Sequence, residues 1–315
     1  MKKRIITGFV ILVFTALMLF SRLYTPYVFD GFVGLMAIMG CIEISRVMER
    51  KKMFSNIIFV GCFPAILYVA MSIGIFKERP WYFYFLYFIV IILALFVINF
   101  LYTIIFKSIT EQEKDKYGIN TSNVQYALQK CMNSTFIMIY PALLFCSLFF
   151  INHFFDFAFV DTTGVGNITT VVLFYLIFTF VVTIMTDTFA LVVGTLVKGP
   201  KLCPLISPNK TISGAIGGWI FGVGAGLLVY YLFTLNNIFS NTMAYIGMDY
   251  WKVLIIAGVT SLIGQIGDIV ASALKRSARV KDYGTIFPGH GGVMDRVDGL
   301  IFNSVVVLFA MFIFI

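Results

Sequence analysis

Positions 168–194 read ITTVVLFYLIFTFVVTIMTDTFALVVG, a stretch that is apolar along nearly all of its length. A helix needs about 20 such residues to cross the hydrocarbon core of a bilayer. Similar stretches recur along the chain, at about 5–21, 27–45, 54–76, 82–106, 134–152, 168–194, 212–235, 251–274 and 298–315. This pattern predicts an all-α, polytopic integral membrane protein with about nine transmembrane helices.

The composition excludes an ordinary soluble domain. Hydrophobic residues make up 60% of the chain and charged residues only 12%, whereas soluble domains carry about 25% charged residues. The net charge of +8 does not indicate a nucleic-acid partner, because the cations lie in short segments between the apolar stretches and not on a soluble face. The start MKKR leads directly into the first apolar stretch without a small-residue cleavage site, so we expect a retained span.

Lysine and arginine are distributed unevenly among the segments that join the predicted spans. Of the 23 in the chain, all but Arg22, Lys77, Arg79 and Lys252 fall in one set of alternate segments. Cytoplasmic segments of membrane proteins hold the excess of positive charge. With an odd number of spans, this asymmetry predicts a cytoplasmic N-terminus and a C-terminus on the far side, and it places the two polar segments described next in the cytoplasm.

Positions 272–298 read SALKRSARVKDYGTIFPGHGGVMDRVD, a polar segment between the last two apolar stretches. Cations bind phosphate, carboxylates bind divalent metals, and glycines let backbone N–H groups approach an oxygen closely. The segment supplies Lys275, Arg276, Arg279, Lys281, Arg296, Asp282, Asp295, Asp298, His290, Gly291 and Gly292. Polar side chains of this density beside a membrane span predict a ligand site.

The polar residues continue backwards into the eighth apolar stretch. Asp268, Ser272, Lys275, Arg276 and Arg279 recur at spacings of three and four, so we expect them on one face of a helix that leaves the bilayer. A carboxylate such as Asp268 within an apolar span is costly and marks a functional site by default, the alternative being a hydrogen-bond anchor between helices.

A second polar cluster, Ser207-Pro208-Asn209-Lys210-Thr211, precedes the glycine-rich stretch 214–226. A lysine between hydroxyls at a helix start can bind an anion, because free N–H groups and the helix dipole both favour phosphate there. Simple N-capping is the alternative. The glycines indicate close approach of neighbouring membrane helices.

Two further acids lie in predicted spans. Asp187, in the sixth span, is a candidate for the functional site. Glu43, in the second, is expected to pair with another span or to shape a lipid-facing cavity. Asp295 and Asp298 share a helix face if the ninth helix begins near Met294.

The order and spacing of these residues resemble the signature of the phosphatidate cytidylyltransferases, also called CDP-diacylglycerol synthases. The matching positions are Ser272, Lys275-Arg276, Lys281-Asp282, Pro288, His290-Gly291-Gly292, Asp295-Arg296 and Asp298, with Gly267-Asp268, Ser207 to Thr211, Asp187, Ala190 and Gly194 extending the match. The chain departs from the pattern at Ala271 and Ser213, where relatives carry Glu, and at Leu191 and Thr195, where they often carry Tyr and Arg.

The resemblance implies a Mg²⁺-dependent enzyme that joins CTP to phosphatidate, releases pyrophosphate and forms CDP-diacylglycerol for phospholipid synthesis. The chain shows no internal repeat and no low-complexity linker, so we expect a single membrane domain over 1–315, with N-terminal spans in 1–135 and a catalytic region in 187–298. The resemblance also implies a homodimer. We expect the protein in the cell (inner) membrane of a bacterium, with the active site on the cytoplasmic side, where the charge asymmetry places it.

The resemblance further implies roles for individual residues. The implied catalytic residues are Asp268, Lys275, Arg276, Lys281, Asp282, His290, Asp295, Arg296 and Asp298, with Asp268 and Asp295 holding the metal. The implied substrate-binding residues are Ser207, Lys210, Thr211, Ser272, Gly291, Gly292 and Asp187. Attack on a nucleotide phosphate depends on positioning and charge neutralisation, so we expect His290 to donate a hydrogen bond to a phosphate or to organise the loop. For Asp282 and Asp298, pairing with Lys281 or Arg296 is the alternative.

Two other functions fit part of the pattern. One is a CTP-dependent transferase or kinase that acts on another membrane lipid, such as a polyprenol or an ether lipid. The other is a transporter, suggested by the acids within spans and the glycine-rich seventh helix. A transporter has no need for a segment so dense in Lys, Gly and Asp, and Asp268 lies only about one turn from the basic end of its helix.

Overall fold

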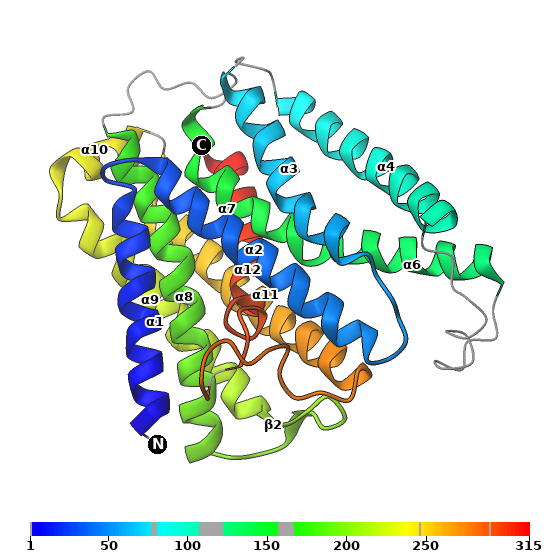
Figure 1. Cartoon of the computed structure of the whole chain (residues 1–315). Coiled ribbons are helices and arrows are strands. Elements are labelled where there is room, and N and C mark those ends of the chain that lie inside the picture. Colours follow the sequence, from blue (N-terminus) through cyan, green and yellow to red (C-terminus); the bar gives the residue numbers. More distant parts are fainter. Residues whose placement is uncertain (1, 77–80, 107–121, 157–166, 246, 290) are drawn as a thin grey trace.

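The computed structural model describes residues 2–76, 81–106, 122–156, 167–245, 247–289 and 291–315. Helices account for most of these residues, as Figure 1 shows, and the predicted all-α class is confirmed. The helices are α1 (Lys2–Ser21), α2 (Pro26–Glu49), α3 (Ile57–Phe76), α4 (Trp81–Phe106), α6 (Asn123–Ile137), α7 (Leu144–Asn152), α8 (Ile168–Leu196), α9 (Ile212–Thr234), α10 (Asn237–Tyr245), α11 (Tyr250–Ser277) and α12 (Met294–Phe314). A π-helical turn, η1 (Met138–Leu143), joins α6 to α7, and a 3₁₀ turn, η2 (Phe154–Asp156), follows α7.

Six helices in the described part of the chain have the length and composition of a membrane span, fewer than the nine predicted. They are α2, the continuous run Asn123–Asn152, α8, α9, α11 and α12. The other three predicted stretches contain shorter apolar helical segments, at Ile6–Ser21, Ile57–Ile73 and Ile89–Ile105. The helices that contain these segments, α1, α3 and α4, are 20, 20 and 26 residues long.

The fifth predicted span begins earlier than expected. Helix α6 starts at Asn123 because Ser122 and Gln125 form a capping box, in which each side chain accepts a hydrogen bond from the other residue's backbone N–H. Residues 123–133, which precede the predicted span, are therefore helical, and residues 107–121 lie outside the described residues. The helical run kinks at Tyr140, which has non-helical dihedral angles beside Pro141.

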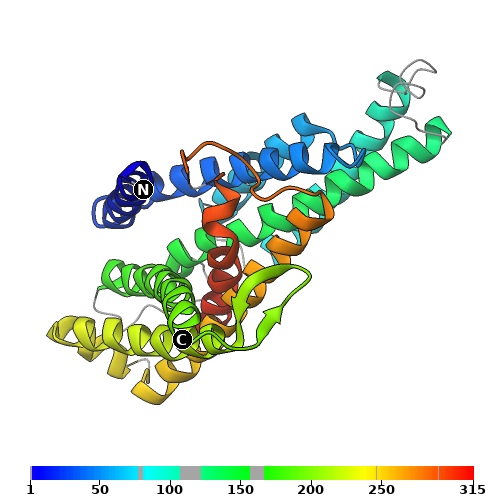
Figure 2. The ribbon, with the colours of Figure 1, turned by 90° about the horizontal axis from the view of Figure 1, so that it is seen from below.

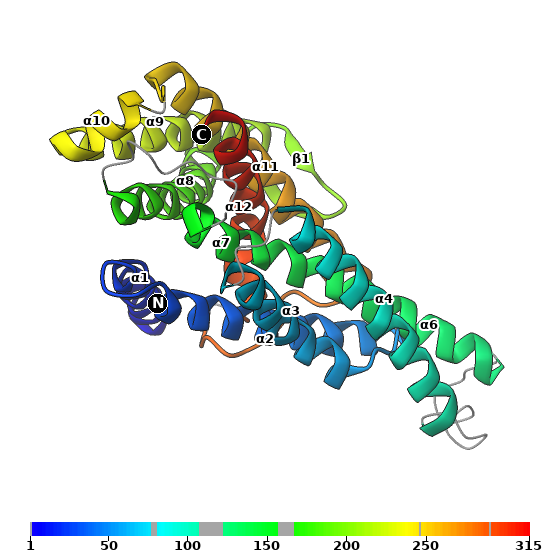
Figure 3. The ribbon, with the colours of Figure 1, turned by 90° about the horizontal axis from the view of Figure 1, so that it is seen from above.

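A short β-hairpin lies between α8 and α9, in a segment from which no strand was predicted. Strand β1 (Lys201–Cys203) pairs antiparallel with β2 (Ser207–Thr211), with Lys201 opposite Thr211. The hairpin and the loop that joins α11 to α12 both lie toward the lower end of the molecule in Figure 1. Figure 2 looks onto that end. Figure 3 looks onto the opposite end, where α10 and the C-terminus lie.

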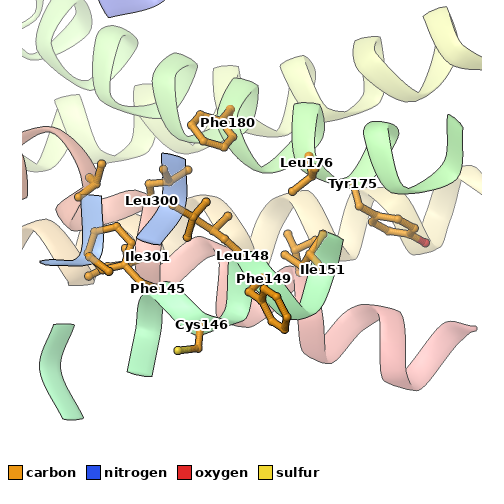
Figure 4. Packing of buried hydrophobic residues seen from close by; sticks show 14 of the residues in the cluster. Phe145, Cys146, Leu148, Phe149, Ile151, Tyr175, Leu176, Phe180, Leu300 and Ile301 are labelled. Carbon is orange, nitrogen blue, oxygen red and sulfur yellow. The ribbon is translucent and has the colours of Figure 1, made fainter. Parts of the chain in front are cut away.

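The centre of the structure is formed by α8, α9, α11 and α12, with α7 and α2 against α12. Figure 4 shows how Phe145 and Leu148 of α7, Phe180 of α8, and Leu300 and Ile301 of α12 lie together in the buried cluster. Helices α3, α4 and α6 extend away from this centre (Figure 3). The helices that carry the polar segments are thus those with the most extensive mutual contact.

Glycines let α9 approach α8 and α11 closely. A Cβ on Gly214 would lie 2.5 Å from the Ala190 carbonyl oxygen, and one on Gly218 would lie 2.6 Å from that of Thr186. A Cβ on Gly222 would overlap the Thr186 hydroxyl. These contacts confirm the predicted role in helix packing for the glycines of 214–226 other than Gly224, where a Cβ meets nothing within 4 Å.

A buried polar network ties α2 to the end of α7, far from the polar segments. His153 hydrogen-bonds Asp30 through Nε2 (2.8 Å) and Asp156 through Nδ1 (2.6 Å), while Asn152 donates to Asp30 Oδ1 (2.7 Å). Burial lowers the pKa of His153, but the hydrogen bonds and charges of Asp156 and Asp30 outweigh it and raise this pKa to about 9. The imidazole is therefore protonated at neutral pH and pairs with both carboxylates.

Replacing Gly222 by Ala is expected to lower the free energy of unfolding by about 1–3 kcal/mol, because the new methyl group must displace the hydrogen-bonded Thr186 and Ser261 hydroxyls. The matched control is Gly224→Ala on the same helix, where a Cβ meets nothing within 4 Å. Thermal unfolding of both variants in detergent measures the difference. Equal midpoints for the two variants would contradict this account of the α8–α9–α11 contact.

Candidate active site

The hairpin and helix α11 meet through an ion pair. The ammonium of Lys210, on β2, lies 2.6 Å from Asp268 Oδ2, and both side chains are partly exposed, at 27% and 30%. A second contact joins the hairpin turn to the end of α11, where Arg276 Nε donates to the Ile206 carbonyl at 3.1 Å. The two polar segments that the sequence singled out therefore form one continuous site.

Helix α11 meets α12 through Lys275. Its ammonium lies 2.8 Å from Asp295 Oδ1 and 3.8 Å from Asp298 Oδ2. Because α12 begins at Met294, the two aspartates lie one turn apart, and the expectation that they share a helix face is confirmed. Asp298 pairs with Lys275 and not with Arg296 or Lys281, the partners considered from the sequence.

Asp295 also organises the loop between α11 and α12. Its Oδ2 accepts the backbone N–H groups of Tyr283 (2.7 Å) and Gly292 (3.0 Å). Gly291 has a φ of +84°, and a Cβ there would lie 2.7 Å from the same oxygen. In this structure the Gly-Gly pair accommodates a carboxylate of the protein itself, so the predicted binding of substrate by these glycines stays a prediction.

Tyr283 is a site residue that the sequence analysis missed. Its ring is buried under the ammonium of Lys275, 5.2 Å from the ring centroid, and its hydroxyl donates to the Ala271 carbonyl at 2.9 Å. Burial raises the pKa of this phenol well above its usual range, so it stays a neutral donor. No sequence signal identified it, because a lone tyrosine in a polar loop has no characteristic spacing.

Three carboxylates from three helices face one region. The charge of Asp298 (α12) interacts with those of Asp268 (α11) and Asp187 (α8), and Asp187 in turn interacts with Asp268, Lys210 and Arg296. Like charges repel unless cations compensate them, and Lys210, Lys275 and Arg296 are the cations that interact with this group. The site therefore holds several oxygen donors of the kind that Mg²⁺ prefers.

The acidic side chains of the site are oxygen donors for a metal ion. Within the described residues, no group of three or more His, Cys, Asp or Glu side chains is arranged to hold a metal ion by itself. Magnesium in nucleotide enzymes is usually held by one or two carboxylates plus substrate phosphates. One or two aspartates of the site can meet that requirement. The described residues do not supply a complete set of protein ligands for the metal.

The other predicted residues differ in their exposure. Lys281 and Asp282 are exposed on the loop, and neither forms a salt bridge with a residue that the structure describes. Arg279 lies beyond the end of α11 with a φ of 56°, so the expectation that it continues the helix face is wrong. Arg296 is exposed on α12, and Ser207 and Ser272 are half-buried. His290 lies outside the described residues.

Thr211 and Ser213 form the start of α9. Thr211 is its N-cap residue and accepts the Gly214 N–H at 3.1 Å, so the N-capping alternative is confirmed for this residue. The Ser213 hydroxyl donates to the Lys198 carbonyl and to Thr211 Oγ1. Ser213, at the position where relatives carry Glu, thus connects the segment before the hairpin to the start of α9.

Comparison with known proteins agrees with this geometry. A sequence model described as the Cytidylyltransferase family matches residues 2–314. The chain is 39% identical over 130 residues to a phosphatidate cytidylyltransferase of Staphylococcus haemolyticus and 40% identical over 130 residues to one of Staphylococcus aureus. Each alignment covers 41% of this chain and 46% of the relative, so the chain matches about half the length of these curated relatives.

Replacing Lys275 by Met is expected to lower the free energy of unfolding by about 3 kcal/mol, because the buried Asp295 carboxylate loses its cation. Adding Asp295→Asn to this variant is expected to recover part of the loss by removing the unpaired charge. The matched control is Lys281→Met on the exposed loop, for which we expect no change. Denaturation of the four proteins in detergent checks this, and a loss from Lys281→Met as large as that from Lys275→Met would argue against it.

Proposed function

The chain belongs to the Cytidylyltransferase family, and from that premise we propose that it transfers the cytidylyl group of CTP to phosphatidate. The products are CDP-diacylglycerol and pyrophosphate. The observation that carries this proposal is the meeting of Lys210 with Asp268, and of Lys275 with Asp295 and Asp298, where the helices end. Cations suited to phosphate and carboxylates suited to a metal then lie together at the depth of a lipid headgroup.

The proposed reaction is a displacement at phosphorus. An oxygen of the phosphatidate phosphate attacks the α-phosphorus of CTP, a new phosphorus–oxygen bond forms, and the bond to the bridging oxygen of the β-phosphate breaks. Pyrophosphate leaves with that electron pair. The attacking oxygen is already anionic at neutral pH, so the chain has to position the reactants and neutralise charge more than remove a proton. His290 keeps its proposed role as a hydrogen-bond donor to a phosphate.

We propose Mg²⁺ as the cofactor, held by aspartates of the site. Asp268 is partly exposed, and Lys210 is its salt-bridge partner among the described residues, whereas both oxygens of Asp295 already accept hydrogen bonds. The charges of Asp298 and Asp187 interact with that of Asp268. Bound to Asp268, Mg²⁺ would neutralise charge on the phosphate oxygens. Lys210 would then be released from Asp268 and free to bind a phosphate.

A cavity beside the site suits the apolar part of a lipid. It has a volume of about 300 Å³, lies between α2, α6 and α11, and is lined by residues that include Val47, Met132, Phe136, Leu274 and Tyr283. Tyr283 also belongs to the active-site loop, so the cavity and the charged cluster share a wall. An acyl chain in this cavity would place its phosphate near Lys275.

The proposed activity is tested by supplying membranes that contain the chain with labelled CTP, phosphatidate and Mg²⁺. We expect CDP-lipid from the native chain, loss of product when EDTA removes the metal, and a fall of about 100-fold or more for Asp268→Asn. The matched control is Asp249→Asn at the other end of α11, for which we expect native activity.

Parallel reactions in which a polyprenol or an ether lipid replaces phosphatidate test the alternative acceptors. Product from one of these lipids but not from phosphatidate would replace the proposed substrate. Product formation by Asp268→Asn equal to that of the native chain would reject the proposed site. A homodimer stays a prediction, which the same purified protein tests by its mass in detergent.

We further propose that the site faces the cytoplasm of a bacterial cell. The N-terminus, the hairpin and the loop before α12 lie toward one end of the molecule, as Figure 1 shows, and α11 separates them from Asp249 by 28 helical residues, about 42 Å. A cysteine at the exposed Thr285 is expected to react with a membrane-impermeant maleimide only after the cells are permeabilised. A cysteine at Asp249 is expected to react in intact cells. Both carry Cys62→Ser and Cys203→Ser, which remove the cysteines that are not buried, and the reverse pattern would invert the proposed orientation.

A further inference from the structure

Glu43 lies in the N-terminal half of the chain but contacts the start of α12. It is 3% exposed on α2, and its Oε1 and Oε2 accept the backbone N–H groups of Val293 (3.0 Å) and Met294 (2.9 Å). The first N–H groups of a helix have no partner within the helix and need a cap. The residue in the N-cap position of α12 is Val293, whose side chain has no oxygen and makes no capping hydrogen bond. A carboxylate 250 residues earlier in the sequence supplies the cap instead.

The glycines of the loop make room for this carboxylate. A Cβ on Gly292 would lie 2.5 Å from Glu43 Cδ, and one on Gly284 would lie 2.9 Å from the same atom. Both distances are too short for a side chain. Two glycines of the loop, one near its middle and one near its end, are thus required by a residue of another helix.

Glu43 and Asp295 together hold the loop and the helix start. The consecutive N–H groups of Gly292, Val293 and Met294 donate to Asp295, Glu43 and Glu43 in turn. Asp295 also accepts the Tyr283 N–H. The middle of the loop and its C-terminal end are therefore held together by two carboxylates. Helix α12 begins at this point and places Asp295 and Asp298 beside Lys275.

We propose that Glu43 is a positioning residue for the transfer reaction, setting where α12 starts and hence where Asp295 and Asp298 lie. This inference rests on the proposed function. Through Glu43, α2 contributes to the position of α12, a contribution that none of the motifs in the C-terminal half makes. Glu43 touches neither substrate in this account and acts only through the backbone of the loop and of α12.

The first test compares Glu43→Gln with Glu49→Gln, a matched change six residues further along α2, where the charge of Glu49 interacts with those of Lys130 and Arg46. Glutamine offers one acceptor oxygen for the two N–H groups, so kcat is expected to fall about 10- to 100-fold. KM for CTP is expected to stay unchanged, because the hairpin that carries Lys210 is not altered. Glu43→Asp keeps two acceptor oxygens and is expected to have an activity between those of Glu43→Gln and the native chain. Glu49→Gln is expected to match the native chain.

The second test needs no activity. A cysteine replaces Val293, which is 0% exposed, in the chain that carries Cys62→Ser and Cys203→Ser. Its reaction with a maleimide, followed by mass spectrometry, is expected to be slow with Glu43 and at least about tenfold faster with Glu43→Gln, because the uncapped helix start opens more often. The Glu49→Gln background is expected to react as slowly as the Glu43 background.

The outcomes separate this inference from the proposed function. If the native chain forms CDP-lipid and Glu43→Gln keeps its kcat, the inference is overturned and the proposed function stands. If thermal unfolding shows a large loss of stability and the fall in kcat equals the fraction of protein that is unfolded under the assay conditions, with KM unchanged, Glu43 is only a structural anchor and the inference is again overturned. If the native chain forms no CDP-lipid, the proposed function fails, and unchanged labelling of Val293→Cys in Glu43→Gln removes the positioning role as well.

Discussion

The pairing of Lys275 with two aspartates of α12 is the contact on which the site depends. Asp295 and Asp298 are each 8% exposed, and a buried carboxylate without a cation is strongly destabilising. Lys275 lies within 2.8 Å of one and 3.8 Å of the other. This places the end of α11 beside the start of α12. The loop that joins the two helices contains Tyr283 and the glycines.

Glycines lie in close contact with neighbouring groups in two settings in this structure. On α9 the glycines face the backbone and small side chains of α8 and α11, so their absent side chains allow helices to touch. In the loop before α12 the glycines face the carboxylates of Glu43 and Asp295. In the first case the glycine is needed for packing within the membrane. In the second it is needed because a charged group must reach backbone N–H groups.

The polar groups at the two ends of the molecule are balanced differently. At the far end His153 lies between Asp30 and Asp156, and every member of this group has a partner in the protein. At the site end the four carboxylates of Asp187, Asp268, Asp295 and Asp298 outnumber the three cations among the described residues that interact with them, Lys210, Lys275 and Arg296. The first arrangement is complete without a ligand, whereas the second has capacity for a further cation, which is why the proposed metal and nucleotide belong there.

The membrane class, the helical stretches and the residues of the signature can be predicted from the sequence, because hydrophobic length and motif spacing are local properties of the chain. Helical periodicity also predicts that Asp295 and Asp298 share a face if α12 begins near Met294, and the structure shows that it begins there. The pairing of Lys210 with Asp268, the position of Tyr283 under Lys275 and the capping of α12 by Glu43 emerge only when the chain is folded. These contacts join residues up to 250 positions apart, and no local pattern encodes a partner on another helix. The hairpin between α8 and α9 escaped prediction for a related reason, since its strands are too short and polar to show alternation and exist because Thr211 and Lys210 are held by α9 and α11.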